Sequence, residues 1–356
     1  MSAAPRFAAF GEALTDFVRQ GDDVWRSVPG GAPWNVARAM AAFGVASAFG
    51  GAISRDCFGD ALWQASLEAR LDTRGVQRVD KSPLLAMVHA THPPQYFFVG
   101  DDSADLHFDV DALPDEWLAG LRWALFGGIS LAREPLSGRL LALAERLKRG
   151  GTKIAYDPNF RVLMDERYDP TLARMLALAD LVKLSADDVR GLLRCSDVEA
   201  GLAALRARNP QAAFFFTDGA APARWYTTAG VWEGVPPAID VVDTVGAGDC
   251  SLAGLLASLL DGAEMSGGEP LRAALAAGAG ACLAAGAVPP SPAQRAQLAA
   301  RVAFSAASAP STLAWSSSNS CIEAAPSFER VCERASRRRV ASSSAARWAM
   351  SACAAV

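Results

Sequence analysis

The sequence is poor in the side chains that hold metals and form disulfides. Its 356 residues include only three histidines and seven cysteines, and no two cysteines have the spacing Cys-x-x-Cys. His89 and His92 precede two prolines and have no third ligand nearby, which argues against a zinc site. Cysteines scattered singly are typical of reduced thiols packed as small apolar side chains, so we expect a cytoplasmic protein.

Long apolar runs and an excess of positive charge are also missing. No hydrophobic stretch is long enough to cross a bilayer, and the short segment 1–6 leads directly into a strand-like run, so we expect neither a membrane span nor a signal peptide. The formal net charge of −4 argues against a nucleic-acid groove. Because 51% of the residues are hydrophobic, the chain can bury the core of one large α/β domain or of two smaller ones.

Short apolar runs alternate with helical patterns along most of the chain. We expect strands at 6–10, 46–50, 123–126, 153–156, 181–184 and 213–217, and helices at 35–43, 58–70, 134–148, 171–179, 186–193, 198–208, 252–260 and 271–285. This alternation predicts right-handed βαβ units in a mostly parallel sheet covered by helices on both faces.

Two segments depart from this pattern. Residues 84–88, 96–99 and 106–108 read as short strands between turns rich in Pro and Asp, which predicts a small additional β-sheet. Beyond Val302 the chain is dominated by Ser, Ala and Arg without a clear period. We expect residues 303–356 to form a disordered tail, and the alternative is a small helical appendage at 328–339.

The segment from Asp243 to Asp249, Asp-Thr-Val-Gly-Ala-Gly-Asp, is the most informative motif. It stands before an apolar helical stretch, so the amides of Gly246, Ala247 and Gly248 are expected at a helix N-terminus, where free N–H groups and the helix dipole favour an anion. A carboxylate beside an anion site, here Asp249, suits a general base next to a phosphoryl group in transfer. The simpler alternative is a turn with a capping Asp.

These seven residues resemble the second signature of the ribokinase/PfkB family of carbohydrate kinases. Gly-Gly-Ala-Pro-Trp-Asn at 30–35 resembles the first signature in its fructokinase-like form, and the resemblance covers about residues 6–300. It implies a kinase domain over 1–302 with a ribokinase-like three-layer α/β sandwich. It also implies that segments 12–30 and 84–110 form a β-sheet lid over the sugar.

Several polar residues are candidates for the sugar site. Asp16 follows the first strand, where open α/β sheets bind ligands, although an exposed turn residue is equally compatible. Gly30 and Gly31 allow close approach of the backbone, and Asn35 offers a donor and an acceptor; the alternative is a Gly-Gly turn with an Asn cap. Arg161 ends an Asp-Pro-Asn-Phe-Arg segment similar to that of fructokinases and 2-keto-3-deoxygluconate kinases, where it would bind sugar or phosphoryl group.

Two of these motifs have purely structural alternatives. Arg161 could instead form an ion pair with Asp157. The segment 50–59 also resembles a family motif, but here we expect Asp56 only to hold a turn and cap a helix.

The resemblance also implies a nucleotide site. Lys183 begins a segment that stands where the family has Asn-x-x-Glu, with Ser185 and Asp188 in the two motif positions. Asp188 is then expected to bind Mg²⁺ through water, whereas Ser185 could simply be an N-cap. Thr217 and Gly219 match the start of the nucleotide loop.

The rest of the nucleotide site departs from the family pattern. Pro222 replaces the last glycine of the nucleotide loop, and no Asn stands near Gly278 to face the adenine. Asp243 and the carbonyl of Val245 match two ligands of a monovalent cation, such as K⁺, in the family.

The resemblance implies ATP-dependent phosphorylation of a sugar hydroxyl, with fructose as the first candidate. The alternatives are 2-keto-3-deoxygluconate or another keto sugar, a nucleoside, and a catalytically inactive sugar-binding protein of this fold. Association of two chains through the lid is left open.

Overall fold

The structure is a computed structural model that describes residues 4–91 and 94–307. The predicted tail beyond residue 307, including the alternative helix at 328–339, lies outside the described residues, as does His92. Within these ranges every helix is too short or too polar to cross a bilayer.

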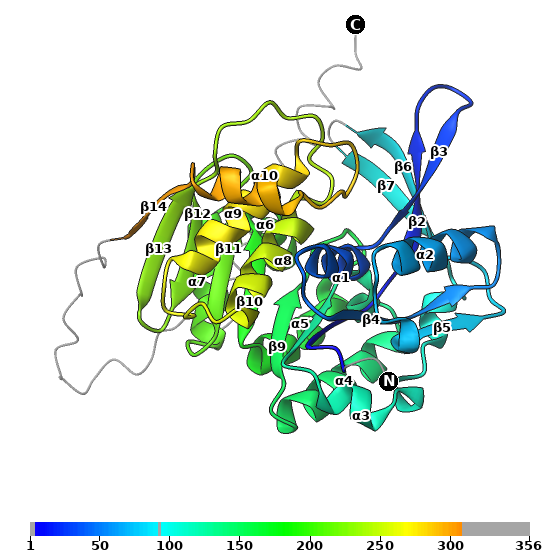
Figure 1. Ribbon diagram of the computed structural model, residues 1–356. Helices are drawn as coiled ribbons and strands as arrows, with labels where there is room; N and C mark the ends of the chain where they lie inside the picture. The colour runs from blue at the N-terminus through cyan, green and yellow to red at the C-terminus, as the bar shows by residue number, and fades with distance from the viewer. Residues whose placement is uncertain (1–3, 92–93, 308–356) are drawn as a thin grey trace, which may run out of the picture.

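A ten-stranded sheet forms the middle layer, with the strand order β14-β13-β12-β11-β10-β9-β8-β1-β4-β5 (Figure 1). Its strands are β1 (Phe7–Phe10), β4 (Ser47–Ser54), β5 (Val76–Val79), β8 (Trp123–Gly127), β9 (Lys153–Asp157), β10 (Leu181–Ser185), β11 (Ala213–Thr217), β12 (Ala223–Thr227), β13 (Gly230–Val235) and β14 (Ala303–Ala306). Pairing is parallel from β5 to β11 and antiparallel from β11 to β14. The predicted, mainly parallel α/β sheet is therefore confirmed.

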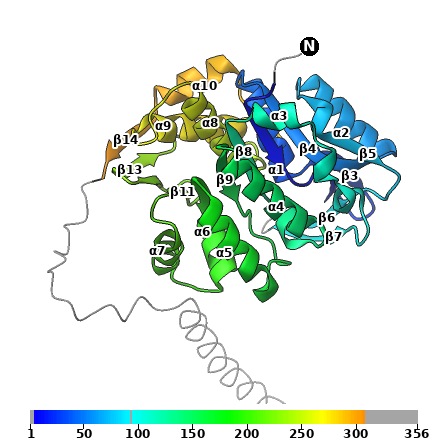
Figure 2. The ribbon, with the colours of Figure 1, turned by 90° about the horizontal axis from the view of Figure 1, so that it is seen from below.

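Helices cover both faces of this sheet (Figures 1 and 2). One layer contains α1 (Ala32–Ala42), α2 (Cys57–Glu68), α8 (Ala247–Leu260), α9 (Glu269–Ala281) and α10 (Pro292–Ala299). The other contains α3 (Asp115–Ala119), α4 (Leu136–Arg149), α5 (Asp169–Leu178), α6 (Ala186–Leu193) and α7 (Val198–Arg208). Short 3₁₀ helices connect them: η1 (Thr73–Gly75), η2 (Ala104–His107), η3 (Val110–Ala112), η4 (Ile129–Ala132) and η5 (Glu166–Tyr168).

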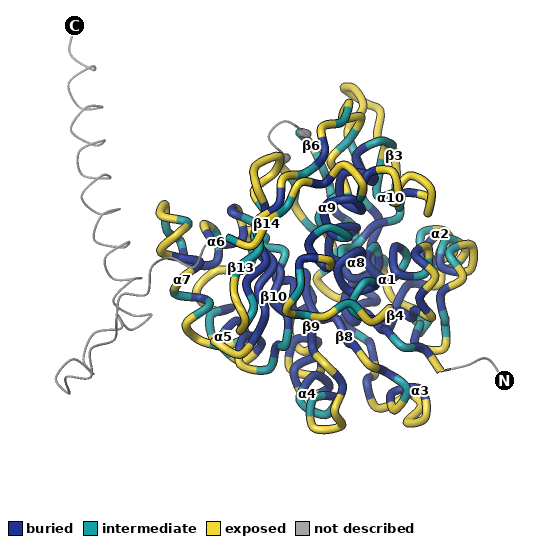
Figure 3. Tube along the Cα trace, turned by 60° about the vertical axis from the view of Figure 1, so that its left-hand side comes forward, coloured by how far each residue is buried: buried dark blue, intermediate teal, exposed yellow. Residues whose placement is uncertain are grey.

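Alternation of side chains along each strand builds both cores. On β11, Phe214 and Phe216 pack with the helices of one layer, whereas Phe215 packs with those of the other. Both faces of the sheet are therefore shielded from solvent, and Figure 3 shows the central strands as buried.

A second sheet projects from one end of the molecule, and we call it the lid (Figure 1). It has four strands in the order β3-β2-β6-β7, namely β2 (Leu14–Arg19), β3 (Trp25–Gly30), β6 (Leu85–Thr91) and β7 (Pro94–Val99). Its existence was predicted, but the third predicted strand at 106–108 is wrong. Leu106 belongs to η2 and is buried in the main core with Phe108. The prediction failed because an apolar alternation over three residues cannot distinguish a strand from a helical turn.

The predicted boundary at Val302 is also wrong, since the fold continues through β14. Its residues Ala303–Ala306 pair with β13, and the rings of Phe304 and Trp232 lie 5.9 Å apart. The antiparallel strands β12, β13 and β14 and the helix α10 were not predicted, because they are short runs with little periodicity, and β13, β14 and α10 are also largely exposed.

Candidate active site

The candidate site lies at the carboxyl ends of the parallel strands. The chain leaves β1 there, and β1 lies between β4 and β8, so the crevice at this switch of direction is where open α/β sheets bind ligands. The lid strand β2 starts four residues after β1 ends. The lid therefore begins beside this crevice.

Three predicted residues from different elements meet in this space. Nδ2 of Asn35, on α1, donates to Oδ2 of Asp249, on α8, at 2.9 Å. Asp16, on β2, lies close enough to Asp249 for each charge to disfavour the other. Oδ1 of Asn35 is buried without a hydrogen-bond partner among the described residues. An orphaned acceptor beside two carboxylates is suited to a ligand that carries hydroxyl groups.

The N-terminus of α8 provides the predicted anion site. Gly246 precedes the helix with φ 77°, and a side chain there would collide with Ala287. The amide of Ala247 donates to Thr244 and that of Cys250 to Gly246. The amides of Gly248 and Asp249 remain without a partner among the described residues, as at other helix N-termini.

A buried ammonium group faces this helix N-terminus. Nζ of Lys183 would lie 3.5 Å from a Cβ atom placed on Gly248, and only 7% of the Lys183 side chain is exposed. Lys183 occupies the position on β10 where strand alternation points toward α8, and it lies 3.2 Å from Oδ1 of Asp157. The ammonium and the free amides together offer hydrogen-bond donors to an anion between β10 and α8.

Asp157 at the end of β9 shares this lysine. Burial raises the pKa of Asp157 to about 6, even though the Lys183 charge opposes the shift. The charges of Asp157, Asp188 and Asp249 raise the pKa of Lys183 above its ordinary value against the effect of burial, so the lysine remains charged. The alternative ion pair between Asp157 and Arg161 is therefore wrong, because Lys183 occupies that place.

Asp188 is held inside the protein and does not suit the predicted Mg²⁺ role. Its Oδ1 accepts from the amide of Phe160 at 2.7 Å, and its Oδ2 accepts from the amide and hydroxyl of Ser185 at 2.6 and 2.7 Å. With Lys183 3.8 Å away, a divalent cation would be repelled. Ser185 and Asp188 form the capping box of α6, so the alternative prediction of an N-cap is confirmed for Ser185.

Asp249 is placed in an environment that favours its protonated form. Burial raises its pKa, while the hydrogen bond from Asn35 and the charges of Lys183 and Arg161 oppose that shift. A carboxylate with a raised pKa is a better proton acceptor near neutral pH than an ordinary aspartate.

Asp16 lies on the lid strand β2, with one carboxylate oxygen against Gly30. A Cβ atom on Gly30 would be 2.2 Å from Oδ2 of Asp16, and one on Gly31, where φ is 114°, would be 2.5 Å from the carbonyl oxygen of Glu12. Both glycines are thus required by the close approach of neighbouring atoms. Burial raises the pKa of Asp16 to about 6, and Arg161 lowers it only in part.

Arg161 joins the site together with a residue that sequence reasoning missed. Its Nη1 donates to the carbonyls of Asn159 and Phe160 and to Oδ1 of Asn159, which has a positive φ of 46°. Its guanidinium lies 5.4 Å from the ring centre of Tyr96 on the lid strand β7. An aromatic residue in an alternating strand signals only β-structure, so nothing in the sequence assigned Tyr96 to the site.

The remaining predicted nucleotide residues lie on the next strand. Thr217 pairs with Ser185 at the ends of β11 and β10, and Gly219 follows in a left-handed turn with φ 57°. Gly278 serves the packing of α9 on α8, since a Cβ atom there would lie 2.0 Å from Oγ of Ser251. No adenine contact is therefore needed to explain that glycine.

The predicted cation ligands hold a loop together. Oδ1 of Asp243 accepts from the amide of Val245 at 3.1 Å, and its Oδ2 accepts from the amide of Gly286 at 2.8 Å. Within the described residues, no group of three or more His, Cys, Asp or Glu side chains is placed to hold a metal ion. Asp56 likewise caps α2 as predicted, accepting from the amides of Phe58 and Gly59.

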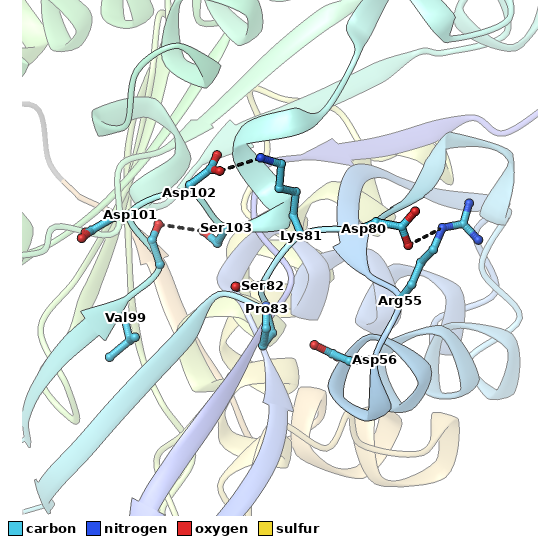
Figure 4. A pocket seen from close by; sticks show the side chains of 11 residues that line it. Arg55, Asp56, Asp80, Lys81, Ser82, Pro83, Val99, Asp101, Asp102 and Ser103 are labelled. Atoms are coloured by element: carbon cyan, nitrogen blue, oxygen red, sulfur yellow. Dashed lines mark hydrogen bonds and ion pairs between the residues drawn. The ribbon is translucent and has the colours of Figure 1, made fainter.

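A cavity of about 600 Å³ lies at the base of the lid, outside this site (Figure 4). Its charged lining is largely internally paired: Arg55 lies 3.5 Å from Asp80, and Lys81 lies 2.6 Å from Asp102. None of the predicted catalytic, sugar or nucleotide residues lines it.

Known proteins resemble this chain over most of its length. The model of the pfkB family carbohydrate kinases matches residues 5–294. A fructokinase of Klebsiella pneumoniae is 33% identical over 258 residues, which cover 70% of this chain and 82% of that protein.

Solved structures agree in fold. The fructokinase of Xylella fastidiosa with bound ATP superposes with a TM-score of 0.75 at 28% identity, over 83% of this chain and 98% of that one. The fructokinase of Vibrio cholerae bound to fructose, ADP and calcium gives 0.73 at 26% identity, over 83% and 98%. The chain therefore belongs to the pfkB family of carbohydrate kinases and is an ATP-dependent sugar kinase.

Proposed function

We propose that this protein transfers the γ-phosphoryl group of ATP to a hydroxyl group of fructose, with Asp249 as the general base. The observation that carries the proposal is the orphaned Oδ1 of Asn35, whose Nδ2 is bound to Asp249. A sugar hydroxyl that donates to Oδ1 is thereby held beside the base. The fructokinase relatives and the fructose-bound structural neighbour support fructose as the sugar.

The proposed step moves one proton and one phosphoryl group. A sugar hydroxyl gives its proton to Asp249 while its oxygen attacks the γ-phosphorus, and the bond from that phosphorus to the bridging oxygen of ADP breaks. In this proposal the free amides of Gly248 and Asp249 and the ammonium of Lys183 stabilise the negative charge that accumulates, whereas the amide of Ala247, which we also predicted for the anion site, is already bound to Thr244. The lid, which contributes Asp16 and Tyr96, excludes water as a competing acceptor.

The other predicted nucleotide residues fit the same arrangement. Thr217 and Gly219 lie beyond Ser185 along the same edge of the sheet and would contact the nucleotide. Mg²⁺ that accompanies ATP would offset phosphate charge, but Asp188 does not fit as its ligand and we assign it no step. A monovalent cation at Asp243 and Val245 remains a prediction that the K⁺ dependence of kcat would test.

A second substrate class is favoured by one observation. Among the described residues Arg161 forms no ion pair in contact, although its charge acts on the carboxyl groups of Asp16 and Asp249. A guanidinium group in this state can bind the carboxylate of an acidic keto sugar such as 2-keto-3-deoxygluconate. Fructose lacks that group, so the two sugars are distinguished by charge.

The test is ATP consumption by the purified protein with a panel of neutral keto sugars, acidic keto sugars, aldoses and nucleosides. We expect the highest kcat/KM with fructose. A preference for 2-keto-3-deoxygluconate that Arg161→Met abolishes would establish the alternative substrate. Sugar binding without turnover of any panel member would instead indicate an inactive sugar-binding protein.

We also propose that two chains associate through their lids. The lid face opposite Asp16 exposes Phe97 (54%), Val99 (48%) and Trp25 (36%), which is unusual for a surface in contact with water. Sedimentation should show a dimer, and Phe97→Glu should produce monomers. A monomeric wild-type protein at micromolar concentration would contradict this proposal.

A further inference from the structure

Glu12 is a buried carboxylate that the proposed chemistry does not use. It lies between β1 and the lid strand β2, and only 3% of it is exposed. Its Oε2 accepts from the amide of Ser130 at 3.2 Å and from the hydroxyl of Ser130 at 2.6 Å. Burying a carboxylate is costly, so its presence here calls for a structural or functional reason.

The neighbouring backbone is shaped around this side chain. A Cβ atom on Gly128, where φ is 68°, would lie 2.1 Å from Oε1 of Glu12. The main-chain carbonyl of Glu12 lies against Gly31, whose own carbonyl accepts from the amide of Asn35 at 2.8 Å. Glu12 therefore touches both the loop after β8 and the start of the helix that carries Asn35.

The loop after β8 also holds the other end of the lid. Ile129 packs in a small core with Leu14 and Ala86 at the base of the lid. Arg133 forms a buried ion pair with Asp105 and donates to the carbonyl of Gly100, just after β7. Segment 128–133 thus anchors the point where the chain enters the lid, through Glu12, and the point where it leaves, through Arg133.

We propose that Glu12 is a positioning residue, which clamps the base of the lid to segment 128–133 and so fixes Asp16 and Asn35 relative to Asp249. Asp16 lies four residues further along the strand that Glu12 introduces. Without the bonds between Glu12 and Ser130, Asp16 could shift with the lid. Displacing a hydrogen-bonding group by about 1 Å weakens binding substantially.

The protonation of Glu12 should make the position of the lid depend on pH. Burial raises the pKa of Glu12 to about 7, and the nearby Asp105 adds to the shift. Among the described residues, the titratable groups that interact with Glu12 are Asp105 and the hydroxyl of Tyr168. As the pH falls through about 7, Glu12 gains a proton and loses strength as an acceptor for Ser130.

The experiment compares Ser130→Ala and Glu12→Gln with Thr152→Val. Thr152 also donates a buried hydroxyl, to the carbonyl of Leu121 at 3.2 Å, but at the opposite end of the strands. We expect Ser130→Ala to raise the KM for the sugar about fivefold to tenfold, less than the full effect of one hydrogen bond to a charged group, because the loss acts on the sugar only through the position of Asp16 and Asn35. The KM for ATP should change little. Thr152→Val should change neither constant.

Two further measurements separate positioning from mere folding. The wild-type sugar KM should change near pH 7, and Glu12→Gln, which keeps the shape but cannot ionise, should lack that change. Hydrogen exchange of β2 should accelerate in Ser130→Ala but not in Thr152→Val. Unchanged sugar KM and lid exchange in both Ser130→Ala and Glu12→Gln would overturn the proposal, as would an equal effect of Thr152→Val.

This inference rests on the proposed sugar-kinase site, and the two can fail separately. A wild-type protein that phosphorylates no sugar would contradict the proposed function. If the wild type is active but the Ser130→Ala and Glu12→Gln variants are indistinguishable from it, only the role of Glu12 is wrong. The exchange measurement needs no substrate and therefore tests the clamp in either case.

Discussion

The side-chain amide of Asn35 donates to the carboxylate of Asp249 across 214 positions of the sequence, at 2.9 Å. This bond joins the helix that follows the lid to the helix that carries the anion site. It orients the carboxylate and leaves Oδ1 of Asn35, which has no partner among the described residues, as a free acceptor beside it. In the proposed mechanism, one residue thereby positions both the base and the substrate.

Replacing the base should remove turnover with little effect on binding. Asp249→Asn keeps the shape and the bond to Asn35 but cannot take up the hydroxyl proton at neutral pH. We expect kcat to fall on the order of 10²-fold or more, while sugar and ATP affinities measured by calorimetry change little. A kcat close to that of the wild type would exclude Asp249 as the base.

Removing the sugar contacts should affect one substrate only. Asp16→Ala and Asn35→Ala each leave hydroxyl groups of the sugar unpaired, so the KM for the sugar should rise more than about tenfold. The KM for ATP should stay nearly constant, because the proposed nucleotide contacts lie on β10 and β11. Equal increases of both constants would show that these residues support the fold of the lid instead.

The same site should respond to acid. Asp16 has a pKa raised to about 6 by burial, so it is an acceptor with full charge above pH 6 and becomes protonated as the pH falls below that value. The KM for the sugar should therefore rise between pH 7 and pH 5. Asp16→Asn should have a higher KM and should keep only the change near pH 7 that we assign to Glu12. A further rise around pH 6 that persists in Asp16→Asn would assign that titration to another group.

The buried lysine should matter for both stability and ATP. Lys183→Met leaves Asp157 and Asp188 without their shared cation, which typically costs about 3 kcal/mol in the free energy of unfolding. The KM for ATP should also rise, because the ammonium faces the N-terminus of α8. Lys148→Met is a matched control, since it breaks the more exposed ion pair to Asp180 and should alter stability by less than about 1 kcal/mol.

The C-terminal boundary can be placed by two truncations. A chain that ends after residue 307 keeps β14 and should retain the activity and melting temperature of the full chain. A chain that ends after Val302 exposes the edge of β13 and the ring of Trp232, so we expect a loss of about 1–3 kcal/mol in the free energy of unfolding. Equal melting temperatures for the two truncated chains would show that β14 contributes nothing.

Much of the fold could be predicted because its signals are local and strong. The helix over Val198–Arg208 and the strand over Ala213–Thr217 have the predicted bounds, since apolar periodicity and the flanking breakers coincide there. The strand β14 could not be predicted, because only its pairing with β13 marks these four mostly exposed residues as a strand. Likewise, η2 was mistaken for a strand because three residues carry too little periodicity.

The sequence by itself determined the family motifs and the types of chemical group that the site contains. Glycines that need positive φ, an aspartate at a helix N-terminus and an Asn after a Gly-Gly pair are properties of short segments, so Gly246, Asp249 and Asn35 could be chosen from sequence. Only the tertiary structure decided the partners. Lys183 rather than Arg161 pairs with Asp157. Asp188 belongs to the capping box of α6, and Glu12 accepts hydrogen bonds from Ser130. These contacts join strands and loops whose relative positions depend on the packing of the whole sheet.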